Sequence, residues 1–212
     1  MADFKGLIRG TPLLPILQPD TVEQAVNIAG AVYASGLRSV EVVRRTSAAA
    51  AAVSAIRETY PDLLVGMGTV LNAEHVREAV DAGSQFIITP TISEKLLTAL
   101  SDSPVPYLPG TASPSDILLA VEAGLSEVKF FPAAVCGGAA MLNNYRAIFP
   151  EVSLCPTGGI SGDNLHEFSS LPNVFAVGGS WMIPKACVAE SDWQGITAAC
   201  SLAQQQYTKE PA

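Results

Sequence analysis

Eight repeats of one pattern constrain what this chain can fold into: a short apolar run, a turn, and an alanine-rich stretch with helical periodicity. Strict alternation of strands and helices predicts a parallel β-sheet covered by helices. Eight such units in about two hundred residues predict a closed (β/α)8 barrel, the TIM barrel, after a short N-terminal helical segment. The predicted strands are Leu13–Leu17, Ser39–Arg44, Leu63–Thr69, Gln85–Pro90, Val105–Pro109, Glu127–Ala133, Ser153–Thr157 and Val174–Gly178.

The alternative fold is an open, doubly wound sheet. Such a sheet would more naturally show five or six strands and a glycine fingerprint after the first strand. The glycines of this chain cluster instead after its late strands. No composition break, linker or charge block divides the sequence, so we expect residues 1–212 to form a single barrel domain.

The composition argues against several classes of partner. Hydrophobic residues make up 49% and charged residues 15%, as in a globular protein with a large core. The net charge of −8 argues against nucleic acid or an anionic membrane as a partner, although a local cluster of donors can still bind a small anion. The start of the chain has no signal-peptide layout, no run approaches the roughly 18 apolar residues of a membrane span, and the cysteines are widely spaced. We therefore expect a cytoplasmic protein with reduced cysteines.

Lys129 stands in the middle of the sixth predicted strand. Side chains alternate along a strand, so Lys129 and Phe131 are expected to share one face. A lysine held between apolar neighbours loses hydration, which disfavours the ammonium form. The neutral amine is a nucleophile for carbonyl carbons, as Schiff-base chemistry requires. The alternative is a lysine whose stem packs while its amine reaches water.

Glu41 and Arg45 come from the second strand and its exit, and their spacing of four puts both on the same side of an extended chain. A glutamate inside a run of valines is costly unless it has a partner or a function. It can act as a general acid and base, and Arg45 can grip a carboxylate with two hydrogen bonds. The alternative is a structural ion pair between the two. Arg44 is expected to face the surface.

Glycines mark the ends of the late strands. Gly158 and Gly159 follow strand seven, and Gly178, Gly179 and Ser180 follow strand eight. In this fold the loops after strands seven and eight often form a phosphate site from backbone N–H groups. Two Gly-Gly pairs at these two positions therefore predict that a phosphate binds there.

Two further patterns bear on the chemistry. Gly66 and Gly68 end strand three, which would let a ligand approach the backbone beside the hydroxyl of Thr69. The histidines, His75 and His166, fall in helical stretches and form no zinc-like cluster with cysteines or carboxylates. We therefore expect neither a metal nor another cofactor.

These motifs together resemble those of the bacterial 2-keto-3-deoxy-6-phosphogluconate (KDPG) and 4-hydroxy-2-oxoglutarate (KHG) aldolases. The resemblance extends from about Leu13 to Pro184 and rests on five motifs in order. They are Val40–Thr46, Gly66–Leu71, Lys129–Ala133, Cys155–Ser161 and Gly178–Trp181.

The resemblance implies a metal-free class I aldolase that forms a Schiff base on a homotrimeric barrel. KDPG would be cleaved to pyruvate and D-glyceraldehyde 3-phosphate, and KHG to pyruvate and glyoxylate. Matched motif by motif, the resemblance implies that Lys129 is the Schiff-base lysine and Glu41 the general acid and base. Arg45 and Thr69 would bind the pyruvate carboxylate, Pro90 and Phe131 would wall the pyruvyl pocket, and Thr157 would contact the substrate chain. The phosphate would be bound by Gly158, Gly159, Gly178, Gly179 and Ser180. The chain departs from the family pattern at Val43, Ala134 and Cys136, which frame the distal end of the pocket.

Three other classes of function remain open from the residues alone. A sugar-phosphate epimerase or a thiamine phosphate synthase would share the late glycine loops. A non-catalytic sensor of a phosphorylated ligand would share them too, and a pure assembly protein would need none of them. Lys129, Glu41 and Arg45 together favour the aldolase, because the other functions do not need a buried amine that forms imines.

Overall fold

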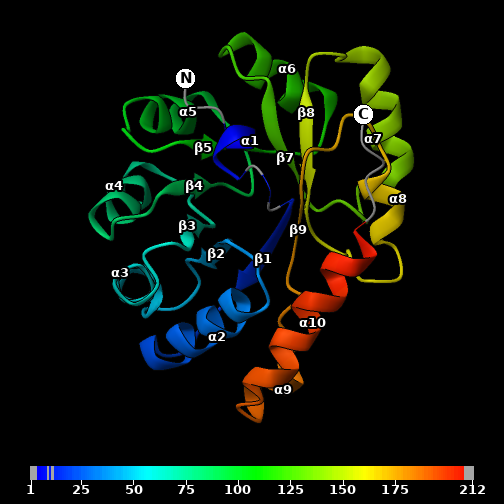
Figure 1. Cartoon of the computed structure of the whole chain (residues 1–212). Helices are drawn as coiled ribbons and strands as arrows, with labels where there is room; N and C mark the ends of the chain where they lie inside the picture. Colours follow the sequence, from blue (N-terminus) through cyan, green and yellow to red (C-terminus); the bar gives the residue numbers. More distant parts are fainter. Residues whose placement is uncertain (1–3, 9, 11, 208–212) are drawn as a thin grey trace.

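The computed structural model describes residues 4–8, 10 and 12–207 (Figure 1). All paired strands are parallel, and helices lie outside the curled sheet. The strands are β1 Leu13–Leu17, β2 Ser39–Val43, β3 Leu64–Gly68, β4 Phe86–Ile88, β5 Tyr107–Leu108, β6 Gly110–Thr111, β7 Glu127–Phe130, β8 Ser153–Pro156 and β9 Val177–Gly179. The helices are α1 Phe4–Leu7, α2 Val22–Ala34, α3 Ala49–Thr59, α4 Ala73–Asp81, α5 Glu94–Ser101, α6 Pro114–Glu122, α7 Gly138–Ile148, α8 Leu165–Ser169, α9 Lys185–Ala189 and α10 Trp193–Gln206.

The prediction of a closed eight-stranded barrel is wrong. The strands form a curled six-stranded sheet in the order β5-β4-β3-β2-β1-β9 and a separate three-stranded sheet in the order β6-β7-β8. Pro109, the predicted end of the fifth strand, lies between β5 and a further short strand, β6, and proline has no N–H for a ladder. On the other side β8 approaches the β9 segment through isolated bridges, Leu154 to Val174 and Thr157 to Gly178, rather than through a ladder.

The strand order nevertheless keeps the carboxyl ends of the strands together, as a site in this fold requires. Neighbouring strands in each sheet are mostly consecutive along the chain, and all run in the same direction. The N–H of Lys129 donates to the carbonyl oxygen of Pro109 at 2.8 Å, which ties β7 to the interrupted segment. The carboxyl ends of the strands therefore converge at one end of the fold, where the polar residues of their loops can meet.

The helices begin and end at the capping residues that the sequence supplies. Thr21 caps α2 and accepts a hydrogen bond from the N–H of Gln24. Ser113 and Asp116 form a reciprocal capping box at the start of α6. Gly124 follows the end of α6 with a φ of +79°, a left-handed conformation that side chains disfavour.

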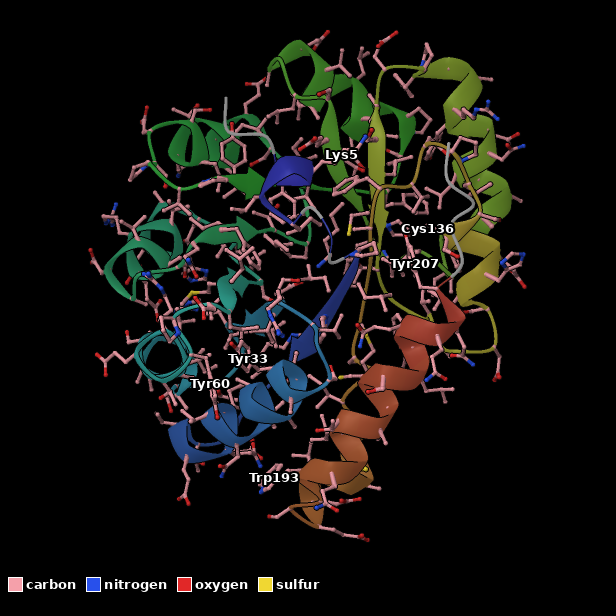
Figure 2. The ribbon with its side chains drawn as sticks, viewed as in Figure 1. Lys5, Tyr33, Tyr60, Cys136, Trp193 and Tyr207 are labelled. Atoms are coloured by element: carbon pink, nitrogen blue, oxygen red, sulfur yellow. The ribbon has the colours of Figure 1, made fainter. Side chains whose placement is uncertain are left out.

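The helix layer packs through aromatic contacts as well as alanines. Tyr33 of α2 and Tyr60, which follows α3, have ring centroids 5.6 Å apart and lie together in Figure 2. Gly30 makes room for this pair, because a Cβ there would lie 2.4 Å from the hydroxyl oxygen of Tyr60. No helix in the part of the chain that the structure describes is long and apolar enough to cross a membrane.

An apolar cluster fills the inside of the curled sheet at the amino ends of the strands. Phe4 of α1 is buried, and its ring centroid lies 5.4 Å from that of Phe86 and 6.3 Å from that of Phe175. The cluster also contains Ile8, Leu14, Ile88, Leu108, Cys155 and Ala176. The predicted N-terminal helical segment thus covers this end of the interior and leaves the polar residues at the opposite end.

Candidate active site

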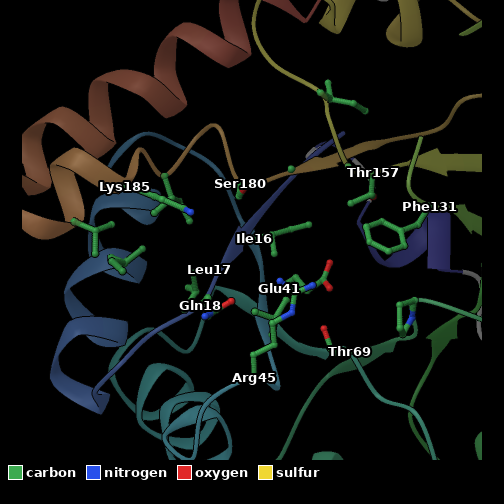
Figure 3. Close-up of a pocket in the computed structure, with 18 of the residues that line it drawn as sticks. Ile16, Leu17, Gln18, Glu41, Arg45, Thr69, Phe131, Thr157, Ser180 and Lys185 are labelled. Atoms are coloured by element: carbon green, nitrogen blue, oxygen red, sulfur yellow. The ribbon is translucent and has the colours of Figure 1, made fainter. Parts of the chain in front are cut away.

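A cavity of about 550 Å³ lies where the carboxyl ends of the strands converge (Figure 3). It is lined by side chains from both sheets, and these include nearly all of the residues predicted for the site. The predicted residues that line it are Glu41, Arg45, Thr69, Pro90, Lys129, Phe131, Thr157, Gly158, Gly159, Gly179 and Ser180. Gly178 does not line the cavity; a Cβ there would lie 2.6 Å from the hydroxyl oxygen of Thr157, so its role is to let the two loops approach.

Lys129 and Glu41 form a buried pair on the wall of this cavity. The Nζ of Lys129 lies 3.5 Å from Oε1 of Glu41, although the residues are 88 positions apart. Lys129 is 5% exposed and Glu41 is 1% exposed. The structure therefore favours the buried interpretation of Lys129 over a lysine that merely reaches water. It also replaces the suggested Glu41–Arg45 ion pair with a Glu41–Lys129 pair.

The second carboxylate oxygen of Glu41 is unused. Oε2 is buried and has no hydrogen-bond partner among the described residues. A buried acceptor without a partner costs about 1–3 kcal/mol, more when it is charged. Because Glu41 lines the cavity, this oxygen is available to accept a proton or a hydrogen bond from a bound molecule.

The absence of a side chain at Gly68 leaves the space that the Glu41 carboxylate occupies. A Cβ at Gly68 would lie 1.9 Å from Oε1 and 2.6 Å from the carboxyl carbon of Glu41. The other glycine of this strand, Gly66, faces the ring of Phe86, which a Cβ would approach to 2.0 Å. Both glycines were expected to admit a ligand to the backbone. The structure gives a different reason, since each admits a side chain of the protein.

Arg45 and Thr69 stand at the mouth of the cavity. Arg45 is exposed, so its guanidinium meets water unless an anion binds, whereas Arg44 pairs with Glu78 on the outer surface as expected. Thr69 has a φ of +62°, a left-handed conformation that is rare for a β-branched residue. Such strain persists where the surroundings hold a residue in place, and it clusters at functional sites.

The two glycine loops present free backbone donors. Gly158 and Gly159 have φ values of +94° and +74°, which only glycine adopts easily. The N–H groups of Gly158, Gly159 and Ser180 donate no hydrogen bond to any residue that the structure describes. Unpaired amides at one end of a cavity are suited to bind an anion.

His75, His166 and Cys155 do not line the cavity. The side chain of His75 accepts a hydrogen bond from the N–H of Leu71 at the start of α4. Burial raises the pKa of the Cys155 thiol to about 12, so this neighbour of Lys129 in the sheet remains protonated and is a poor nucleophile. Among the described residues no group of three histidines, cysteines or carboxylates could hold a metal ion.

The sequence analysis missed part of the lining. Gln18 and Asp20 directly follow the first strand, so the rule that sites form at strand ends could have found them. Lys185 begins α9, a short helix that was not predicted. The remaining unpredicted lining residues are Ile16, Leu17, Gln24, Ile28, Val43, Ile160, Ile183, Val188 and Ala189.

Comparison with known proteins points to one family. The sequence model described as "KDPG and KHG aldolase" matches residues 5–199. A 2-dehydro-3-deoxy-phosphogluconate aldolase of Pseudomonas aeruginosa is 40% identical over 195 residues, which cover 92% of this chain and 89% of that protein.

Two solved structures are also similar. A KDPG aldolase of Legionella pneumophila, with pyruvate captured as a covalent carbinolamine intermediate, superposes with a TM-score of 0.92 at 37% identity and covers 95% of this chain and 98% of its own. The KDPG aldolase of Zymomonas mobilis with 3-phosphoglycerate has a TM-score of 0.89 at 34% identity, covering 98% and 97%. The match over most of each chain, together with the buried Lys129–Glu41 pair, shows that this chain belongs to the KDPG and KHG aldolase family.

Proposed function

We propose that this protein is a class I aldolase that cleaves KDPG to pyruvate and D-glyceraldehyde 3-phosphate, and KHG to pyruvate and glyoxylate. The observation that carries the proposal is the buried pair of Lys129 and Glu41, 3.5 Å apart on the wall of a cavity with anion-binding groups at its mouth. The similar enzyme of Legionella pneumophila holds pyruvate as a covalent carbinolamine, an intermediate that such a lysine forms.

The first half of the reaction converts the C2 ketone into an iminium on Lys129, which can accept electrons from the C3–C4 bond. Glu41 accepts a proton from the Lys129 ammonium across the 3.5 Å contact, and the neutral amine attacks the C2 ketone. The resulting carbinolamine loses water, with its leaving oxygen protonated by Glu41, and an iminium remains on Lys129. The wall formed by Phe131, whose ring centroid is 5.3 Å from Nζ, limits the water around this amine.

The second half breaks the C3–C4 bond. Glu41 takes the proton of the C4 hydroxyl, the C4–O bond becomes a carbonyl, and the electrons of the C3–C4 bond move into the iminium. The aldehyde leaves and an enamine stays on Lys129. Protonation at C3 and hydrolysis of the iminium then release pyruvate and restore the amine. The unpartnered Oε2 of Glu41 supports its use as the base in this half.

We propose for the lining residues the binding roles that the family resemblance implies, and their place in the cavity supports these roles. Arg45 and Thr69 hold the carboxylate of the keto acid at the mouth, and Pro90 helps Phe131 to wall the pyruvyl end. Thr157 meets the hydroxyls of the chain. Gly158, Gly159, Gly179 and Ser180 surround the phosphate, with the free amides of Gly158, Gly159 and Ser180 as donors, while Gly178 shapes their loop.

The alternatives explain less of this site. An epimerase-like enzyme or a phosphate-ligand sensor would use the glycine loops, yet neither needs an amine and a carboxylate buried against each other. We also propose a homotrimer, a single domain over residues 1–212, no cofactor and a cytoplasmic location, in keeping with the family resemblance and with the free thiols of all four cysteines.

The direct test is reduction with borohydride in the presence of pyruvate, read by peptide mass spectrometry, beside a pyruvate-release assay with KDPG and KHG in a buffer containing EDTA. We expect a reduced pyruvyl adduct on Lys129 and cleavage of KDPG without added metal. A folded protein that forms no adduct at neutral pH would contradict the class I mechanism. An adduct without KDPG or KHG cleavage would keep the mechanism and overturn the proposed substrates.

Gly68→Ala is expected to lower kcat by about 10²-fold with little loss of thermal stability, because the new methyl group collides with the flexible end of Glu41 and displaces the general base. Gly66→Ala is the matched control on the same strand. Its methyl meets the buried ring of Phe86, so it should cost about 1–3 kcal/mol of unfolding free energy instead.

Steady-state kinetics and thermal unfolding of both variants check this contrast. In a Glu41→Gln background the Gly68→Ala change should have little further effect on kcat, since the group that it displaces is already inactive. A Gly68→Ala enzyme that keeps kcat within threefold of the wild type, or that adds its full effect to Glu41→Gln, would show that Gly68 does not act through Glu41.

A further inference from the structure

Lys185 is a cation of the cavity that the proposed reaction leaves without a role. Among the described residues, the lysines and arginines that line the cavity are Arg45, Lys129 and Lys185. Arg45 serves the keto-acid carboxylate and Lys129 the ketone. Figure 3 shows the Lys185 side chain extending into the cavity on the side of Ser180.

A tight turn brings Lys185 to this position. The N–H of Ile183 donates to the carbonyl oxygen of Ser180 at 3.0 Å, which folds the chain back directly after β9. Pro184 follows, and its carbonyl oxygen accepts the N–H of Val188 at 3.1 Å as α9 begins. Lys185 therefore belongs to the same loop as the phosphate-binding amide of Ser180.

The Lys185 ammonium has no hydrogen-bond or ion-pair partner in the described part of the chain. The Lys185 side chain is exposed. The acidic residues that line the cavity with it are Asp20 and Glu41. Glu41 is paired with Lys129, and Asp20 forms no ion pair with Lys185, so the ammonium is available to an anionic ligand.

We propose that Lys185 is a specificity-determining residue, whose ammonium binds the terminal phosphate of the substrate and favours phosphorylated KDPG over the dicarboxylate KHG. This inference rests on the proposed function. The KDPG phosphate lies several bonds further from the ketone than the second carboxylate of KHG. When Lys129 holds the ketone, the phosphate therefore extends to the glycine loops and Lys185, whereas the shorter KHG ends closer to Lys129. On a protein of net charge −8, a cation beside the loop amides adds local attraction for this dianion.

The test compares Lys185→Gln with the wild type on both substrates. We expect KM for KDPG to rise about tenfold, a modest effect for a charge-assisted hydrogen bond at an exposed site, with kcat changed less than twofold. The ratio of kcat/KM for KDPG to that for KHG should fall about tenfold. Lys185→Arg, which keeps the charge, should recover most of this ratio, and Lys95→Gln on the exposed surface of α5 should not change it.

A binding measurement separates this inference from the proposed function. Titration calorimetry with glycerol 3-phosphate requires no turnover, and its Kd should weaken about tenfold in Lys185→Gln. If the wild type cleaves KDPG but Lys185→Gln leaves both KM and this Kd within twofold, the role of Lys185 is overturned and the aldolase stands. If the wild type cleaves neither substrate but binds glycerol 3-phosphate through Lys185, the proposed function fails and the anion site stands. Equal losses on KDPG and KHG would also overturn the inference.

Discussion

Lys129→Met will remove the trapped pyruvate adduct and lower kcat for KDPG cleavage by about 10⁴-fold or more, because the covalent path depends on the amine. Methionine keeps the length and apolar stem of a side chain that is 5% exposed, so packing beside Phe131 is largely retained. The substitution therefore separates the loss of the nucleophile from a loss of the fold better than alanine would.

Borohydride trapping with mass spectrometry and steady-state kinetics measure this effect, and thermal unfolding verifies that the variant is folded. Lys95→Met is the control, because Lys95 is exposed on α5 and does not line the cavity. It should give the wild-type adduct and rate. A folded Lys129→Met enzyme that still yields a reduced pyruvyl adduct, or that cleaves KDPG at a rate near that of the wild type, would remove Lys129 from the chemistry.

Glu41→Gln will lower kcat by about 10²–10⁴-fold, because an amide of similar size cannot take the C4 hydroxyl proton. The adduct on Lys129 should still form but more slowly, since Glu41 also moves protons during Schiff-base formation. Glutamine also fits the space that Gly68 leaves, so the shape of the wall is kept. The effect should therefore fall mainly on carbon–carbon bond cleavage and proton transfer at C3, and less on substrate binding.

Exchange of the pyruvate methyl protons with deuterium oxide, followed by NMR, isolates this proton transfer from cleavage. We expect exchange to slow in Glu41→Gln in proportion to kcat. Glu41→Asp, which keeps the acid but withdraws it by one methylene, should lie between the two. Wild-type exchange in Glu41→Gln would mean that Glu41 serves only as the structural partner of Lys129, and another base would then have to be sought.

Much of the fold follows from patterns that are local in the chain. Strands and helices alternate with their own periods, so β1 was predicted with the bounds that it has, and the strand of Lys129 was found. The prediction of a closed barrel was wrong. The distant strands β1 and β9 do form a ladder, but no ladder joins β5 to β6 or β8 to β9, although these segments are consecutive in the chain. Pro109 was taken as the end of a strand, and the short β6 beyond it pairs with β7 in a separate sheet.

The sequence by itself determined that parallel strands carry their polar residues to one end, and that Lys129, Glu41 and the late glycines lie there. Only the tertiary structure decided which of these side chains meet. The pairing of Lys129 with Glu41 and the space that Gly68 leaves for Glu41 depend on the register between strands. The place of Lys185 in the same cavity as the glycine loops depends on the path of the loops. Strand periodicity specifies the face of a side chain but not its neighbour across the sheet, since that neighbour comes from a distant part of the chain.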